Sequence, residues 1–315
     1  PAGGIGRPVT TMGSAAPAVD PAPVRPSPVT PLSVVPDRVG SGDPGRVAVA
    51  PDSGLHPWYP LSPCGTECID EQRNRVSTMR MAVRVLRVAA VILSAVCAWP
   101  VVAVSPALAR RRFLRGLSRR VLRALGLTVV IDDRRPFASH TRGLVVANHV
   151  SYLDIPAVAM ISPASFVAKA EIACDPVSAV PARIFGTIRV ERNSLRQLPA
   201  TVRTVTERLE ADASVVVFPE GTTRCGTSIG TFAPAFFQAA IDAGVPVLPI
   251  GLEFATASGH RGAAAFIGDD TPWDTLRRVL RTRGLSVRVT VHESQLAGED
   301  RRELAARCAR LIAGA

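Results

Sequence analysis

Residues 143–154 read GLVVANHVSYLD, a short apolar run followed at once by polar residues that can take part in chemistry. The β-branched run predicts a buried strand over residues 143–147. His149 then emerges at the carboxyl end of a strand, where α/β sheets place their ligands. Asp154 can meet His149 only if a turn separates them, and we expect a helix to start at Ser151. The carboxylate would then hold one imidazole nitrogen and leave the other free as a base. The plainer alternative is a strand-end histidine that bonds a loop, with Asp154 as a helix cap.

Other short β-branched runs surround this stretch and alternate with helical ones. The helical pattern covers residues 198–211, 233–243 and 299–313. The strand pattern recurs at 127–131, 165–168, 187–190, 214–218, 245–252 and 286–291. This alternation predicts an α/β domain over residues 126–315, with a mostly parallel central sheet flanked by helices.

A second polar stretch, FPEGTTR at residues 218–224, also follows an apolar strand. Gly221 lets backbone N–H groups approach a ligand, and Thr222 offers a hydroxyl donor. Arg224 supplies a two-pronged donor suited to phosphate. The stretch therefore indicates an anion site. The plainer alternative is an ordinary turn in which Glu220 and Arg224 form a solvated ion pair.

Two further basic residues are candidates for contact with phosphate. Arg192 ends the charged strand GTIRVER at residues 186–192, although a solvated strand end is the commoner interpretation of such a pattern. Lys169 is the only lysine among 37 basic residues, in a chain otherwise biased to arginine. A compact ammonium on a flexible stem would suit a position near phosphate, and chance is the alternative.

The basic charge of the chain is concentrated in one segment. The net charge is +11, and residues 79–123 contain ten arginines with no acidic residue, which leaves +1 for the rest. Nucleic acid or an anionic membrane could attract such a segment. The chain has no nucleic-acid-binding motif, and aromatic residues make up 5% of it, so we expect no nucleic-acid partner and favour the membrane.

The N-terminal part divides into a leader and an anchor. Residues 1–78 are rich in proline and predict a disordered leader, with residues 56–68 as a short docking element. Residues 88–109 carry no charge and would span about 33 Å as a helix, and residues 110–125 predict an amphipathic basic helix as an interfacial alternative. Residues 79–125 are thus a predicted membrane anchor. More arginines follow the apolar run than precede it, which disfavours a cleaved signal peptide and places the domain on the cytoplasmic side of the inner (plasma) membrane.

The six cysteines give little sign of a metal site. Cys64 and Cys68 form a C-x3-C pair, but no second Cys/His pair stands at zinc spacing. We expect no metal, with structural zinc as the minor alternative. Scattered cysteines of this kind are typical of a reducing compartment.

Through four blocks in order, the chain resembles the 1-acylglycerol-3-phosphate acyltransferase family, also called lysophospholipid acyltransferases. The blocks are Asn-His-x4-Asp at 148–154, the basic strand at 186–192, FPEGTTR at 218–224 and VPVLPIG at 245–251. The resemblance covers residues 125–295, and the first and third blocks together are highly specific. The second block departs from the family pattern at Glu191 and Arg189.

The resemblance implies a glycerolipid acyltransferase-like α/β enzyme preceded by a membrane-anchoring helix. It would move a fatty acyl group from acyl-CoA or acyl-carrier protein to the sn-2 hydroxyl of lysophosphatidic acid, giving phosphatidic acid in phospholipid biosynthesis. His149 would be the general base and Asp154 would orient it. The acceptor's phosphate site would be formed by Arg192, Glu220, Gly221, Thr222 and Arg224, with Lys169 as a helper.

The same resemblance implies no cofactor beyond the acyl donor and no metal. Alternatives are the same chemistry on glycerol 3-phosphate or a lyso-aminolipid, and a catalytically inactive membrane-binding protein. A hydrolase would need a nucleophile, and the sequence has no Gly-x-Ser-x-Gly elbow.

Overall fold

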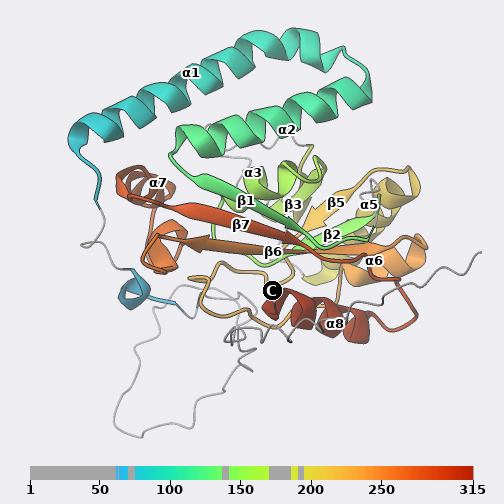
Figure 1. The fold of residues 1–315 in the computed structure, drawn as a ribbon. Coiled ribbons are helices and arrows are strands. Elements are labelled where there is room, and N and C mark those ends of the chain that lie inside the picture. The colour runs from blue at the N-terminus through green and yellow to red at the C-terminus, as the bar shows by residue number, and fades with distance from the viewer. Residues whose placement is uncertain are drawn as a thin grey trace, which may run out of the picture. The chain divides into compact units, whose positions relative to one another are not determined.

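A seven-stranded sheet organises the residues that the computed structural model describes, which are residue 62 and residues 64–69, 75–136, 142–169, 186–190 and 195–314. Its spatial order is β1-β7-β6-β2-β5-β3-β4, and every neighbouring pair is parallel except β6 with β7 (Figure 1). The strands are β1 (Thr128–Asp133), β2 (Leu144–Ala147), β3 (Ser165–Lys169), β4 (Ile188–Val190), β5 (Val215–Val217), β6 (Val247–Ala255) and β7 (Ser286–Val291). The predicted mostly parallel α/β sheet is confirmed.

Helices cover both faces of this sheet, so its central strands are apolar on both sides. In β2, Val145 and Ala147 join one core cluster while Leu144 and Val146 join the other. The first cluster lies under α2, α3 and α7, and the second under α5, α6 and α8 (Figure 1). The helices are α1 (Thr78–Ala103), α2 (Ala107–Ala124), α3 (Asp154–Ala159), α5 (Leu198–Glu210), α6 (Phe237–Asp242), α7 (Pro272–Arg281) and α8 (Arg301–Ala313). Three short 3-10 turns complete the described elements: η1 (Thr66–Cys68), η3 (Leu195–Gln197) and η4 (Gly262–Ala264).

The predicted helix patterns agree with α5, α6 and α8, whereas no helix was predicted where α7 lies. Its start has a capping box, in which the Thr271 hydroxyl accepts the N–H of Asp274 and the Asp274 carboxylate accepts the N–H of Thr271. Pro272 occupies the first helical position, where its missing N–H costs nothing. The helix start is therefore marked in the sequence by Thr-Pro-x-Asp, whereas the few apolar residues that follow give only a weak helical pattern.

The apolar stretch 88–109 does not form one helix, which corrects the expected span. α1 starts ten residues earlier, where the Ser77 hydroxyl caps it by accepting the N–H of Arg80 at 3.5 Å. It ends at Ala103, and Pro106 is the N-cap of α2. A proline disfavours helical conformation in the residue before it, so the chain turns at 104–106. The leader expected over residues 1–78 lies mostly outside the described residues.

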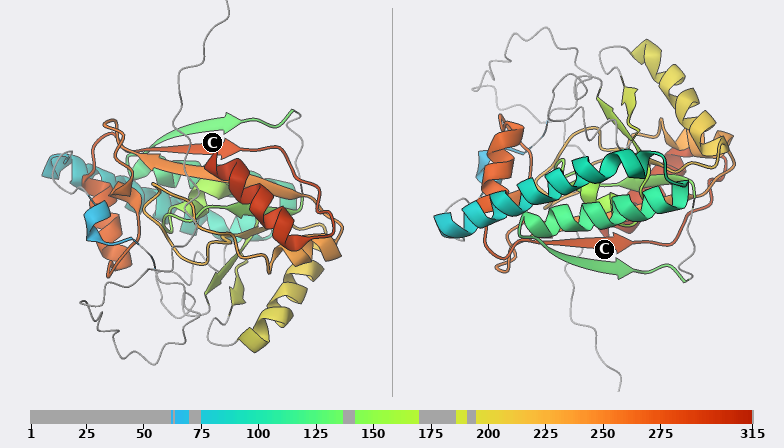
Figure 2. Two further views of the ribbon diagram at one scale, coloured as in Figure 1. Left: turned by 90° about the horizontal axis from the view of Figure 1, so that it is seen from below. Right: turned by 90° about the horizontal axis from the view of Figure 1, so that it is seen from above.

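α1 and α2 run side by side as a hairpin over one face of the sheet (Figures 1 and 2). α2 buries Leu114, Ser118 and Leu122, which recur every four residues and face the domain. Arg84 of α1 donates to the carbonyls of Leu280 at 2.9 Å and Thr282 at 2.8 Å, at the C-terminal end of α7, where a cation is favoured.

α1 is the one helix among the described residues that is long and apolar enough to cross a membrane, with a mean hydropathy of 2.2 over an 18-residue window. Its outer side exposes large apolar residues: Met79, Val83, Val85, Leu86, Ile92, Leu93, Val96 and Val101.

Candidate active site

Two loops leave neighbouring parallel strands at the same edge of the sheet. Val146 of β2 is in register with Val217 of β5, so residues 148–154 and 218–224 start side by side. The loops are bonded to each other, because the Arg224 N–H donates to the carbonyl of His149 at 2.8 Å. Asn148 anchors the first loop to β6 by exchanging two hydrogen bonds with the backbone of Leu252, at 2.9 and 2.7 Å. The sheet thereby brings together two motifs that are far apart in the chain.

His149 and Asp154 form the pair that the sequence predicted. The imidazole Nδ1 lies 2.7 Å from Asp154 Oδ2, and Asp154 is fully buried. The His149 side chain is 22% exposed, and none of the described residues bonds its Nε2. In the neutral tautomer whose Nδ1–H donates to the carboxylate, Nε2 carries no proton and is free to act as a base.

The turn that makes this pair differs from the predicted one. α3 begins at Asp154 and not at Ser151, and it has no side-chain cap. Asp154 Oδ2 also accepts the N–H of Val150 at 2.6 Å and of Ser151 at 3.0 Å. The carboxylate therefore folds the loop back on itself, since three donors converge on one oxygen. Pro156 then falls in the first turn of the helix, where a missing N–H is tolerated.

Phe218 fixes the plane of the imidazole. Its ring is stacked on that of His149, with centroids 4.3 Å apart and an interplanar angle of 14°. Phe218 ends the apolar run of β5 and belongs to the FPEGTTR block, but a contact with His149 could not be predicted without the strand order.

Glu220 lies between the two loops and not in an open phosphate site. Its side chain is 1% exposed, and its two oxygens accept the N–H of His149 and the N–H of Gly230, each at 2.9 Å. Burial raises the pKa of Glu220, while those two N–H donors and the positive Arg224 oppose the rise. A buried carboxyl group whose two oxygens are engaged in this way is better placed to orient the loop and Arg224 than to contact phosphate.

The Arg224 side chain forms an ion pair with Glu220 and lies against Gly230. Its Nε lies 3.0 Å from Glu220 Oε2, and its side chain is 13% exposed, so the pair is buried and not the solvated one considered as the alternative. A Cβ at Gly230 would lie 2.5 Å from Arg224 Nε. Gly221 has a φ of 71°, which permits the turn between Phe218 and Arg224, and Thr222 lies half-buried on the same turn.

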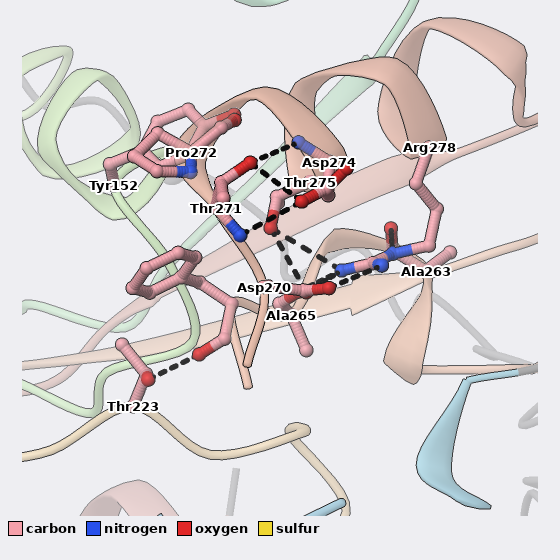
Figure 3. Close-up of polar contacts among 11 residues, drawn as sticks. Tyr152, Thr223, Ala263, Ala265, Asp270, Thr271, Pro272, Asp274, Thr275 and Arg278 are labelled. Atoms are coloured by element: carbon pink, nitrogen blue, oxygen red, sulfur yellow. Dashed lines mark hydrogen bonds and ion pairs between the residues drawn. The ribbon is translucent and has the colours of Figure 1, made fainter. Parts of the chain in front are cut away.

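Thr223 bonds the loop to other parts of the domain. Its hydroxyl donates to the carbonyl of Phe266 (Figure 3). Its own carbonyl accepts a hydrogen bond from the Ser62 hydroxyl at 2.8 Å. The segment after Phe266 is itself secured by Arg278, which is paired with Asp270 and donates to the carbonyl of Ala263 at 3.3 Å (Figure 3). The hydroxyls of Thr222 and Thr223 thus have different surroundings, although the sequence presents them alike.

The described residues do not test two of the predicted phosphate contacts. The backbone of Lys169 ends β3 opposite Val190 of β4, and the structure describes nothing of its side chain. Arg192 lies outside the described residues. Their roles stay predictions.

The α/β domain of this chain is similar in sequence to known proteins. A family model described as Acyltransferase matches residues 128–253. A 1-acyl-sn-glycerol-3-phosphate acyltransferase of Neisseria meningitidis is 38% identical over 181 residues, which cover 57% of this chain and 70% of that protein. The chain belongs to the 1-acylglycerol-3-phosphate acyltransferase family. A lyso-ornithine lipid O-acyltransferase of Pseudomonas aeruginosa is 34% identical over 197 residues, covering 62% of this acyltransferase and 75% of the relative.

A solved structure supports the fold of the acyltransferase. The crystal structure of the 1-acyl-sn-glycerophosphate (LPA) acyltransferase PlsC from Thermotoga maritima superposes with a TM-score of 0.55. The match covers 75% of this chain and 96% of that one, at 19% sequence identity.

The arrangement suits acyl transfer by general base catalysis. A hydroxyl is a weak nucleophile at neutral pH and needs a base, whereas a thioester is already activated. His149 could supply such a base, and Arg224, whose N–H bonds the His149 carbonyl, is a cation suited to an anionic acceptor.

Replacing Gly230 by alanine is expected to lower the kcat/KM of the acyltransferase about 10–100-fold for a phosphate-bearing acceptor. The new methyl group would displace the Arg224 guanidinium, which lies 2.5 Å from its position. Because this is the end of a flexible side chain, the fold should tolerate the shift while the site does not. Steady-state kinetics with a varied acceptor measures the effect.

Gly116→Ala is the matched control, since a Cβ there meets nothing within 4 Å. It should leave kcat/KM unchanged. An equally active Gly230→Ala enzyme would show that the position of the Arg224 guanidinium does not matter.

Proposed function

We propose that this acyltransferase moves a fatty acyl group from acyl-CoA or acyl-carrier protein to the sn-2 hydroxyl of lysophosphatidic acid, giving phosphatidic acid. The observation that carries the proposal is the pairing of a base with an anchored cation at one sheet edge: Asp154 holds His149, and Glu220 holds Arg224. The Neisseria relative is named for this acceptor.

The reaction needs one proton to move and one bond to be exchanged. His149 Nε2 accepts the proton of the acceptor hydroxyl as its oxygen attacks the thioester carbonyl. The buried Asp154 carboxylate stabilises the imidazolium that forms. The tetrahedral intermediate collapses by breaking the C–S bond, and the departing thiolate takes the proton from the imidazolium. The products are the ester and the free thiol, and the protein is regenerated.

Arg224 would bind the acceptor phosphate. A guanidinium can donate two parallel hydrogen bonds to phosphate oxygens, and Glu220 already engages its Nε. Gly221 and Thr222 lie on the turn beside it and would add backbone and hydroxyl donors. Glu220 serves this site indirectly, by orienting Arg224.

The α1–α2 hairpin would hold the enzyme on the cytoplasmic face of the inner membrane, where lysolipid and acyl donor gather. α1 exposes apolar side chains such as Leu86 and Leu93, whose relative exposures are 68% and 64%. The arginines of α1 and α2 add attraction to anionic lipid headgroups. Because α1 lies along α2, and α2 lies on the domain, the hairpin favours docking in the interface over a perpendicular span.

The acceptor is the part of this proposal most open to test, because the Pseudomonas relative is named for a lyso-ornithine lipid, which has no phosphate. Purified enzyme in liposomes would be given acyl-CoA with lysophosphatidic acid or with lyso-ornithine lipid. We expect wild type to favour lysophosphatidic acid. Arg224→Ala should lower kcat/KM for that acceptor about 100-fold, on the scale of a lost charged hydrogen-bond pair, and should affect the phosphate-free acceptor much less.

Arg224→Lys serves as the companion variant, because it keeps the charge and loses the two-pronged geometry. It should recover part of the activity on lysophosphatidic acid. An Arg224→Ala enzyme that is undiminished on lysophosphatidic acid, or equally impaired on both acceptors, would contradict the assignment of Arg224 to phosphate.

A further inference from the structure

Three cysteine thiols lie close together at the end of the loop that carries Arg224. Cys64 and Cys68 come from the segment before α1, and Cys225 directly follows Arg224 in the chain. Their three sulfur atoms all lie within 4.8 Å of one another. Cys225 is buried and the other two are half-buried. No step of the acyl transfer uses them, so their meeting calls for a separate explanation.

The contacts around the thiols hold the segment in a defined position. The Cys225 N–H donates to the Cys64 sulfur at 3.4 Å, and the Ser62 hydroxyl accepts the N–H of Cys64 at 3.3 Å. η1 turns the chain between the two cysteines, with the Cys68 N–H donating to the Gly65 carbonyl at 3.1 Å. A turn of this kind lets both thiols of C-x3-C face one point.

The packing beneath Cys68 leaves the segment little room to move. A Cβ at Gly262 would lie 1.9 Å from the Cys68 carbonyl oxygen, so only glycine admits the chain there. Cys64 and Cys68 also pack against the core cluster under α2, α3 and α7. The three thiols are therefore part of the packed domain.

The distances fit one metal ion better than the other uses of three thiols. At a Zn–S bond of about 2.3 Å, tetrahedral ligands lie about 3.8 Å apart, which is close to the observed cluster. An iron–sulfur cluster would separate thiolates that bind different irons. A disulfide would join two sulfurs at about 2.0 Å and leave the third unexplained. Soft thiolate ligands select zinc over magnesium or calcium.

We propose that Cys64, Cys68 and Cys225 bind one zinc ion, a structural site that fastens the segment before α1 to the loop carrying Arg224. The fourth position would be filled by water. This departs from the expectation of no metal, since the third ligand lies 161 residues beyond Cys64. Motif spacing alone could not find it.

Metal analysis of the purified full-length chain tests the site without reference to acyl transfer. Wild type in detergent should contain about one zinc per chain, as a single site requires. Cys64→Ser and Cys225→Ser should lose it. Cys308→Ser, buried in α8, and Cys97→Ser, exposed on α1, should retain it as matched controls. Cobalt exchanged into wild type should give the thiolate charge-transfer and tetrahedral d–d bands.

A strong chelator should lower the unfolding temperature of wild type, and zinc should restore it. If Cys225→Ser fails to fold, Cys64→Ser and the cobalt spectrum of wild type still decide the matter. Wild type that takes up no zinc, zinc retained by Cys64→Ser, iron in place of zinc, or a disulfide among the three thiols would each overturn the proposal.

Discussion

Replacing His149 by alanine is expected to lower kcat/KM for acyl transfer about a thousandfold, which corresponds to about 4 kcal/mol of transition-state stabilisation. In the proposed mechanism the imidazole takes the proton of the acceptor hydroxyl. Its loss leaves Asp154 with two hydrogen bonds, from the N–H groups of Val150 and Ser151. The buried carboxylate is therefore not stranded, and we expect the variant to fold.

Initial rates with labelled acyl-CoA measure this effect, and thermal unfolding shows whether the variant is folded. His260→Ala is the comparison, because His260 is a half-buried histidine on the loop after β6. It should keep near-normal activity. A folded His149→Ala enzyme that retained more than about a tenth of the activity would be incompatible with a general base at this position.

Asp154→Asn is expected to lower kcat/KM about 100-fold or more, although it changes only one atom. All three donors of the pair converge on Asp154 Oδ2, whereas Oδ1 accepts no hydrogen bond from the described residues. An asparagine can place its carbonyl at the Oδ2 position and keep the geometry. The variant thus removes the negative charge that stabilises the imidazolium, and leaves the orientation of the imidazole in place.

The matched control is Asp270→Asn, a partly buried carboxylate that is 13% exposed and pairs with Arg278 and not with His149. Both variants should lower the unfolding temperature, because each disturbs a buried polar group. Only Asp154→Asn should lower kcat/KM of the folded enzyme strongly. Equal kinetic losses in the two variants would mean that the Asp154 effect reflects stability.

The fold could be predicted from the sequence because strands that are buried on both faces have unbroken apolar runs rich in β-branched residues. Residues 144–147 and 215–217 show this directly. The placing of His149 and Arg224 at strand ends then followed from the general geometry of parallel sheets. The predicted start of α3 at Ser151 was wrong. The helix begins at Asp154, whose carboxylate accepts three hydrogen bonds from the preceding loop, and capping patterns do not predict a loop of this kind.

Other parts of the site depend on contacts between residues that are far apart in the chain. Gly230 matters because the Arg224 side chain passes over it, and Phe218 matters because β5 lies beside β2. Neither relation has a signature in the sequence. The helix bounds near Pro106 were misjudged because an uncharged stretch of 22 residues looks like one span, whereas the proline sets the turn.

The most direct measurement follows both products of the reaction at once. Purified full-length enzyme in liposomes, given acyl-CoA and lysophosphatidic acid, would be sampled by mass spectrometry for phosphatidic acid and free fatty acid. Transfer catalysed by His149 predicts phosphatidic acid in step with released CoA, little free fatty acid, and neither product in quantity from His149→Ala. CoA release accompanied by free fatty acid without phosphatidic acid would show a thioesterase and contradict the account.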